Sequence, residues 1–224
     1  SLGYQIILNP HGKTMNENQI LDLIDQNVIA MIAGTEPLNA LVFEKASSLR
    51  IIVRCGIGMD NVDLSAAKKK GIIVTNTPDA PTRAVAELVI GHLLSLLRKI
   101  SYDDRQIRAG NWKKPMGSLF YGKKIGIIGA GRIGKMVANL SSSFGAIVLA
   151  YDPFVKESND FFSIVSLEKL LKESDIISLH IPYNIDNHYF IDSDAIELMK
   201  EGVIILNISR GGLIDENALY SAIK

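Results

Sequence analysis

The sequence predicts an α/β protein with parallel sheets in two domains, and three observations lead to this prediction. Apolar, β-rich runs alternate with helical patterns along most of the 224 residues, which is the rhythm of βαβ units. The two prolines of TPDAP, residues 77–81, interrupt that rhythm with strong turn signals. The rhythm then begins again after a long helical pattern. We therefore expect one domain at residues 1–80 and a second at residues 81–224.

In the first domain, the apolar runs are short enough for strands, and the intervening runs have helical spacing. Strands are expected where aliphatic and β-branched residues cluster, and helices where apolar residues recur every three or four positions. The expected strands are 4–8, 28–33, 49–54 and 71–76, and the expected helices are 16–26, 38–46 and 64–70. Near-continuous apolar strands of this kind are typical of a parallel sheet that is covered on both faces.

The second domain opens with the longest helical pattern of the chain, from about Thr82 to Ala109. Gly110 follows it, and glycine is the residue that most often ends a helix. Strands are then expected at 124–129, 146–152, 175–181 and 203–209, and helices at 132–144, 167–174, 193–200 and 215–223. This alternation again predicts a parallel sheet with helices on both faces.

The composition argues against several classes of partner. Lys+Arg and Asp+Glu both number 24, so the formal net charge is zero, and the chain has no bulk attraction for nucleic acid or an acidic membrane. The longest apolar stretch, residues 88–97, is too short to span a bilayer. Cys55 is the only cysteine, which fits a reducing compartment such as the cytoplasm. No metal site is expected.

A glycine-rich motif follows the first strand of the second domain. Gly129, Gly131 and Gly134 fit the pattern G-x-G-x-x-G between an apolar strand and a helix, which is the context that this motif requires. The first glycine permits a tight turn, the second lets the backbone approach a pyrophosphate, and the third lets the helix pack closely. The helix N-terminus then offers unpaired N–H groups to the phosphates. The sequence therefore predicts a dinucleotide site here.

Asp152 ends the next strand of the same βαβ unit, just before Pro153. A carboxylate at this place accepts hydrogen bonds from the ribose hydroxyls and repels a 2′-phosphate, which favours NAD over NADP. The alternative is that Asp152 only begins a turn before the proline.

Arg210 follows an apolar strand in the stretch NISRGG, residues 207–212. A guanidinium is a planar fork that can bind two oxygens at once, and its charge polarises a carbonyl group. The alternative is a structural ion pair at the end of a strand.

Four segments resemble the D-isomer-specific 2-hydroxyacid dehydrogenase family, which includes phosphoglycerate dehydrogenases. They are RCGIGMDNVD (54–63), AVAELVIGHLLSLLR (84–98), GIIGAGRIGK (126–135) and LNISRGGLIDENAL (206–219), in the order of the family. The resemblance implies a flavodoxin-like substrate domain and a Rossmann domain, both partial, with the substrate between them. It also implies a homodimer formed through the cofactor domain, by the long helix and Trp112.

The resemblance also implies roles for individual residues. Arg210 would be the catalytic residue that binds the carboxylate and keto oxygen of the substrate, and the backbone amides of Gly56, Ile57 and Gly58 would bind the same carboxylate. Cofactor contacts are implied for Gly129, Gly131, Gly134, Asp152, Thr77, Arg132, Ile133, Ile181, Pro182 and Ile208. Arg54 and Lys69 would bind the phosphate of a phosphorylated substrate. Alternatively, Arg54 caps a strand, and Lys69 belongs to a solvated helix end.

The function implied by the resemblance is NAD-dependent hydride transfer between nicotinamide and a D-2-hydroxy acid or its 2-keto acid. D-3-phosphoglycerate and 3-phosphohydroxypyruvate are the expected pair, and a glyoxylate/hydroxypyruvate or D-lactate-type reductase is the alternative. A non-enzymatic, NAD-sensing scaffold is an alternative from another class.

The acid/base of the family is a histidine oriented by a glutamate, and both follow the arginine loop. We therefore expect the natural protein to continue past Lys224, to begin before Ser1, and to need the missing part for activity. His180, at the end of the strand at 175–181, is the alternative base within the chain. His92 is expected in a core or an interface.

Overall fold

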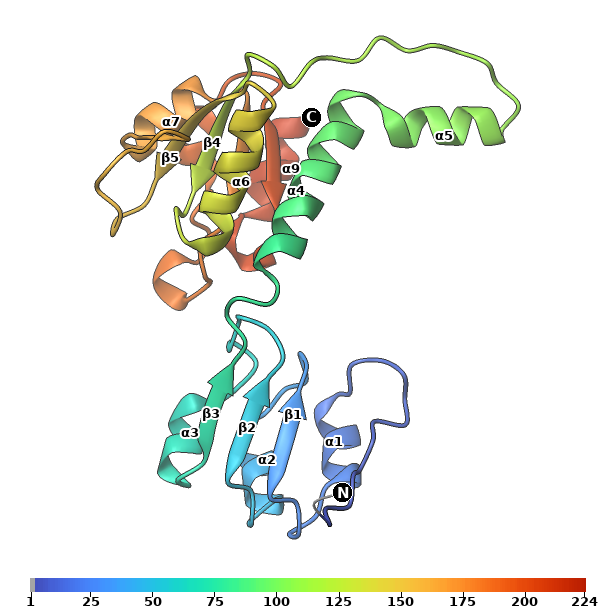
Figure 1. The fold of residues 1–224 in the computed structure, drawn as a ribbon, viewed down its shortest axis with the longest axis vertical. Helices are drawn as coiled ribbons and strands as arrows, with labels where there is room; N and C mark the ends of the chain where they lie inside the picture. Colours follow the sequence, from blue (N-terminus) through green and yellow to red (C-terminus); the bar gives the residue numbers. More distant parts are fainter. Residues whose placement is uncertain (1–2) are drawn as a thin grey trace. The chain divides into compact units, whose positions relative to one another are not determined.

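The computed structural model describes residues 3–224 and forms two compact units. Unit 1 ends at Pro81, and unit 2 is Thr82–Lys224 (Figure 1). Within the described residues, every pair of neighbouring strands is parallel. This confirms the predicted α/β fold class with parallel sheets.

Unit 1 has a three-stranded sheet in the order β1-β2-β3. Each of its helices begins at an Asn or Asp whose side chain accepts a hydrogen bond from a backbone N–H of the first turn, which satisfies one of the free donors there. The elements are α1 Glu17–Leu23, β1 Ala30–Ala33, α2 Ala40–Lys45, β2 Ile51–Arg54, α3 Leu64–Lys69 and β3 Ile73–Asn76.

The helices of unit 1 cover one face of its sheet. Side chains of all three helices, including Phe43, form one buried cluster with Ile52. On the opposite face, Ile32 is 84% exposed and Ile73 is 63% exposed. The prediction that both faces are covered is therefore wrong for the described part of unit 1, because its three helices share a face.

The run at residues 4–8 is not a strand, contrary to prediction. Ile6 and Leu8 are exposed by 78% and 76%. A β-rich run becomes a strand only when a neighbour pairs with its backbone groups, and no strand among the described residues does so.

Unit 2 has a five-stranded sheet in the order β6-β5-β4-β7-β8. Helices α4 and α6 pack on one face, and α7, α8 and α9 pack on the other. The elements are α4 Thr82–Leu97, α5 Ile100–Arg108, β4 Lys124–Ile128, α6 Arg132–Ser143, β5 Ile147–Tyr151, β6 Ser163–Ile164, α7 Leu167–Glu173, β7 Ile176–Leu179, the 3₁₀ helix η1 Ile185–Asn187, α8 Ser193–Glu197, β8 Ile204–Asn207, the 3₁₀ helix η2 Gly211–Leu213 and α9 Glu216–Ile223. The strand order is that of a Rossmann sheet without its sixth strand.

The predicted helix at 82–109 is two helices, because the chain turns between α4 and α5. Lys99 adopts a left-handed backbone with φ +57°, a conformation uncommon for a residue other than glycine. Figure 1 shows α5 and the segment after it extending away from the sheet of unit 2. None of the helices in residues 3–224 is both long and apolar enough to cross a membrane.

Candidate functional site

Three strands of unit 2 end side by side at one edge of the sheet. The register aligns Ile128 of β4 with Leu179 of β7, and Leu179 with Asn207 of β8. The glycine-rich turn, residues 180–182 and the loop of Arg210 follow these strands directly. Ligands of open parallel sheets bind at this carboxyl edge, where the strand order reverses. Unit 2 therefore brings the predicted cofactor residues of its three loops to the same edge as Arg210.

The glycines of the turn are required by close approach. Gly129 has φ +98°, and a Cβ on it would lie 2.8 Å from the carbonyl carbon of His180. A Cβ on Gly134 would lie 1.9 Å from the carbonyl oxygen of Gly129. In contrast, nothing lies within 4 Å of the Cβ position of Gly131. The space in front of Gly131 is therefore open to a ligand, whereas the other two glycines pack against backbone.

The N-terminus of α6 is free of side-chain caps. Its N-cap residue is Gly131, which supplies no side-chain acceptor. By comparison, α7 is capped by Ser166 and α9 by Asp215. The first N–H groups of α6 and the positive end of its dipole are thus available to an anion. Together with the open space at Gly131, this arrangement fits the pyrophosphate of a dinucleotide.

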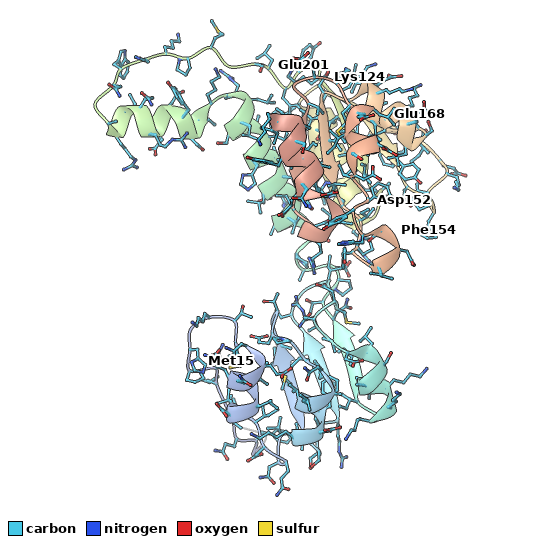
Figure 2. All side chains as sticks on the ribbon, turned by 180° about the vertical axis from the view of Figure 1, so that it is seen from behind. Met15, Lys124, Asp152, Phe154, Glu168 and Glu201 are labelled. Carbon is cyan, nitrogen blue, oxygen red and sulfur yellow. The ribbon has the colours of Figure 1, made fainter. Side chains whose placement is uncertain are left out.

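Asp152 connects the end of β5 to the glycine-rich turn. Its Oδ2 accepts a hydrogen bond from the backbone N–H of Ala130 at 2.8 Å, and its Oδ1 accepts one from Phe154 at 2.8 Å. Figure 2 shows Asp152 and Phe154 at the opposite end of unit 2 from Lys124, which begins β4. Oδ1 also accepts a hydrogen bond from the backbone N–H of Val155 at 3.3 Å. A carboxylate offers about four acceptor positions, two on each oxygen, so Oδ2 retains capacity for a ribose hydroxyl.

His180 is a poor candidate for the acid/base. Its Nε2 lies 2.9 Å from Oγ of Ser178, which is fully buried in β7. Burial lowers the pKa of His180 to about 4, so the imidazole is neutral at physiological pH. A group with this pKa holds no proton to donate near pH 7.

His92, expected in a core or an interface, is exposed on α4.

The backbone around Arg210 is held by short contacts. Asn207 Nδ2 donates to the carbonyl oxygen of Arg210 at 2.7 Å, and the backbone N–H of Leu213 donates to the same oxygen at 3.2 Å. The guanidinium Nη1 of Arg210 donates to the carbonyl oxygen of Ser209 at 3.0 Å. Ser209 Oγ donates in turn to the carbonyl oxygen of Leu179 at 3.2 Å. Arg210 therefore lies on a loop that is hydrogen-bonded to the ends of β7 and β8.

In unit 1, the loop after β2 is organised around Arg54, which is only 5% exposed. Its Nε donates to Asn61 Oδ1 at 3.2 Å, and its Nη1 donates to the carbonyl oxygen of Cys55. Asn61 Nδ2 donates onward to the carbonyl oxygen of Glu36 at 2.7 Å. Arg54 thus stabilises the loop that contains it, which agrees with the structural alternative for this residue.

The backbone amide of Gly56 already has an acceptor. It donates to Thr77 Oγ1 at 2.8 Å, and the N–H of Thr77 donates back to the carbonyl oxygen of Gly56 at 3.2 Å. In this structure the amide of Gly56 therefore donates to Thr77, and its contact with the substrate carboxylate stays a prediction. The same pairing binds Thr77 to this loop within unit 1.

Lys69 does not lie beside Arg54. Lys69 is the last residue of α3, shortly before Ile73, and Ile73 pairs with Ile51 at the start of β2. Arg54 is the last residue of β2. The helix between two parallel strands returns the chain to the opposite edge of the sheet. Arg54 and Lys69 therefore belong to opposite ends of β2, and their role in binding a phosphate stays a prediction.

Sequence reasoning missed the residues that hold these loops. Asn207 and Asn61 bind loop backbone, and Ser178 contacts His180. Asparagine at a strand end is a known turn signal, so Asn207 could have been found from its position. Ser178 carries no such signal, because a serine within an apolar strand is common.

Comparisons with known proteins agree with this geometry. Residues 90–224 match the family described as D-isomer specific 2-hydroxyacid dehydrogenase, NAD binding domain. The D-3-phosphoglycerate dehydrogenase of Methanocaldococcus jannaschii is 40% identical over 217 residues, which cover 94% of this chain and 41% of that protein. The hydroxypyruvate reductase of Thermotoga maritima is 39% identical over 211 residues, which cover 93% of this chain and 69% of that protein.

A solved structure supports the same relationship. The crystal structure of D-lactate dehydrogenase from Aquifex aeolicus, complexed with NAD and lactic acid, matches with a TM-score of 0.80 and 33% identity. The match covers 88% of this chain and 61% of that chain. The chain thus spans between 41% and 69% of the length of these three relatives. NAD is the cofactor of this domain, as predicted, and the chain belongs to the D-isomer-specific 2-hydroxyacid dehydrogenase family.

Proposed function

We propose that the whole protein is an NAD-dependent oxidoreductase that interconverts a D-2-hydroxy acid and its 2-keto acid. One observation carries the proposal: Arg210 follows β8 at the same carboxyl edge as the glycine-rich turn after β4. The names of the three relatives point the same way, since D-3-phosphoglycerate, D-lactate and the product of hydroxypyruvate reduction are all 2-hydroxy acids.

Arg210 would bind and polarise the substrate. Bound NAD supplies or accepts the hydride. The guanidinium offers paired donors to a carboxylate oxygen and to the C2 oxygen of the substrate. Its positive charge stabilises the negative charge that develops on that oxygen in the reduction.

We propose that the proton comes from a histidine in a part of the protein outside this chain. Two facts support the proposal. The pKa of His180, the alternative base within the chain, is lowered to about 4, so His180 holds no proton to donate near pH 7. The relatives also extend well beyond the region that the chain matches.

The activity is tested with the complete protein, NADH and a panel of 2-keto acids. We expect NADH oxidation with at least one of them, and we expect Arg210→Gln to lower kcat/KM by about a thousandfold or more. Arg83→Gln is the matched control, because Arg83 is an exposed arginine of α4 that pairs with Glu87. NADH binding without oxidation of NADH by any acid would favour a scaffold instead.

We propose D-3-phosphoglycerate and 3-phosphohydroxypyruvate as the substrate pair. The 40% identity with a D-3-phosphoglycerate dehydrogenase and the cation Arg54 support it. Arg54→Ala should raise the KM for 3-phosphohydroxypyruvate more than the KM for hydroxypyruvate, which lacks the phosphate. Equal effects on both KM values would mean that Arg54 only maintains its loop, as its burial suggests.

We propose that the protein is a homodimer that pairs through α5 and the segment after it. Exposed apolar side chains are concentrated there, and large patches of this kind mark interfaces. They include Ile100, Ile107, Trp112, Met116 and Leu119. Trp112 is 90% exposed in the single chain, and Trp112→Glu would place a charge in the interface. Sedimentation velocity of this variant should therefore show monomers. Phe154→Glu is the control, since Phe154 is 92% exposed on another loop.

A further inference from the structure

The loop after β7 carries an aromatic cluster of three residues. Tyr183 Oη lies 3.0 Å from His188 Nδ1, and the two rings meet edge to face with their centroids 5.9 Å apart. The rings of His188 and Tyr189 are stacked with their centroids 3.8 Å apart. Tyr189 has φ +56°, so the backbone adopts a left-handed conformation at the residue that completes the stack. We call Tyr183, His188 and Tyr189 the aromatic trio.

The trio packs against the loop of Arg210 at Gly212. A Cβ on Gly212 would lie 2.7 Å from Cε2 and 3.2 Å from Cζ of Tyr183. The backbone N–H of Tyr189 donates to the carbonyl oxygen of Gly212 at 2.8 Å. Two residues further on, Ile191 donates to the carbonyl oxygen of Leu213 at 2.9 Å. A ring and two backbone hydrogen bonds therefore join these loops.

This contact reaches Arg210 through one short turn. Gly212 lies in the 3₁₀ helix η2, which begins directly after Arg210. The N–H of Leu213 closes that turn on the carbonyl oxygen of Arg210. Asn207 holds the same oxygen from the other side. A displacement of Gly212 would thus move the backbone that aims the guanidinium, and a misplacement of about 1 Å costs on the order of a hundredfold in rate.

We propose that the aromatic trio positions Arg210, with Tyr183 as the positioning residue. This inference rests on the proposed role of Arg210 in binding the keto acid. The ring of Tyr183 lies against the place of a Cβ at position 212, so the turn cannot shift toward that ring. The contact with His188 holds the ring, and Asn187 Nδ2, which donates to the carbonyl oxygen of Pro182 at 2.6 Å, closes the loop around it.

A double-mutant cycle in the complete protein tests the contact. Tyr183→Ala should lower kcat/KM for the keto acid by about a hundredfold, while the Kd for NADH stays within about twofold. Gly212→Ala should have at least as large an effect, since its Cβ meets the ring. The double variant should recover part of the loss, because the new methyl group takes the space of the ring. Tyr183→Phe keeps the ring and should stay near wild type.

Tyr220→Ala is the control, because Tyr220 is a 62% exposed tyrosine of α9; it should change neither constant. An unchanged kcat/KM in Tyr183→Ala would overturn the proposal. An equal loss of NADH affinity would also overturn it, since the defect would then lie in the cofactor site.

A readout without turnover separates this inference from the proposed function. The ¹⁵N NMR signal of Arg210 Nε, assigned by its absence in Arg210→Lys, should shift in Tyr183→Ala and return toward wild type in the double variant. A signal that does not move in Tyr183→Ala refutes the positioning role. If the wild-type protein turns over no keto acid, the proposed function fails, and this signal still decides the role of Tyr183.

Discussion

The two units each carry a glycine loop at the carboxyl end of a parallel strand, but different atoms hold the two loops. After β2, side chains hold the loop: Arg54 binds Asn61 and Cys55, and Thr77 accepts the N–H of Gly56. The loop after β4 is held mainly by packing of its glycines against backbone, as the positions of Gly129 and Gly134 show, and Asp152 supplies one side-chain hydrogen bond, to the N–H of Ala130.

The difference has a physical reason. A pyrophosphate must approach backbone N–H groups closely, so the turn after β4 has no room for side chains on its inner side. The loop after β2 has a buried guanidinium beneath it, and a Cβ on Gly56 would lie 2.8 Å from Nη1 of Arg54. The loop after β4 should therefore tolerate little change at its glycines, and the loop after β2 should depend on its polar side chains.

The largest effect is expected from Gly134→Ala. Its Cβ would lie 1.9 Å from the carbonyl oxygen of Gly129, so α6 must move away from β4. We expect a loss of about 4 kcal/mol in the free energy of unfolding of unit 2 and of at least about 100-fold in NADH affinity. Urea unfolding and NADH fluorescence titration measure the two quantities.

Gly91→Ala is the matched control for this substitution. Gly91 lies within α4, and nothing lies within 4 Å of its Cβ position. Alanine in an exposed helix should stabilise by up to about 1 kcal/mol. Equal losses in both variants would contradict the account of backbone packing at Gly134.

His180, which lies against the glycine-rich turn, should also make the free energy of unfolding of unit 2 depend on pH. His180, next to Gly129, has its pKa lowered from 6.5 to about 4 by burial. Between these values the unfolded chain binds the proton and the folded chain does not. The free energy of unfolding of unit 2 is therefore highest above pH 6.5, and it decreases as the pH falls toward 4.

The expected loss over this interval is about 3 kcal/mol, since one pH unit corresponds to about 1.36 kcal/mol. His180→Gln cannot titrate, so the difference between wild type and variant should shrink as the pH falls. Urea unfolding of both proteins at a series of pH values measures it. A difference that is constant with pH would show that the imidazole is not the group responsible.

Arg54→Leu tests the other side of the comparison. The substitution leaves Asn61 and the carbonyl oxygen of Cys55 without their donor in a partly buried loop, which should cost about 2 kcal/mol. Hydrogen exchange of peptides from residues 54–63 should accelerate. Arg50→Leu is the control, because Arg50 is exposed just before β2; it should leave the exchange unchanged.

The smallest effect is expected from Thr77→Val. The variant removes the acceptor of the Gly56 N–H and keeps the shape of the side chain. A loss of about 1 kcal/mol should accelerate exchange of the Gly56 amide by about fivefold. Thr77→Ser retains the hydroxyl and should exchange like wild type. If the two variants behave alike, the hydroxyl does not hold the loop.

The sequence by itself determined the elements with strong local patterns. Glycine spacing between an apolar strand and a helix predicted the turn at Gly129–Gly134, because that backbone path excludes side chains whatever surrounds it. Apolar runs predicted the strands of both sheets except β6, whose two residues, Ser163 and Ile164, are too few to form such a run. The stretch NISRGG predicted Arg210 at a strand end, and the structure places it there.

Only the tertiary structure decided which groups meet across the chain. Residues 4–8 have the composition of a strand, but a strand needs a partner, and the described residues supply none. The N–H of Gly56 binds Thr77, and Lys69 lies away from Arg54, because loop closure and helix direction place them so. The ring of Tyr183 at Gly212 is such a contact too. Local patterns specify backbone conformation, whereas contacts between distant residues arise only when the strands align.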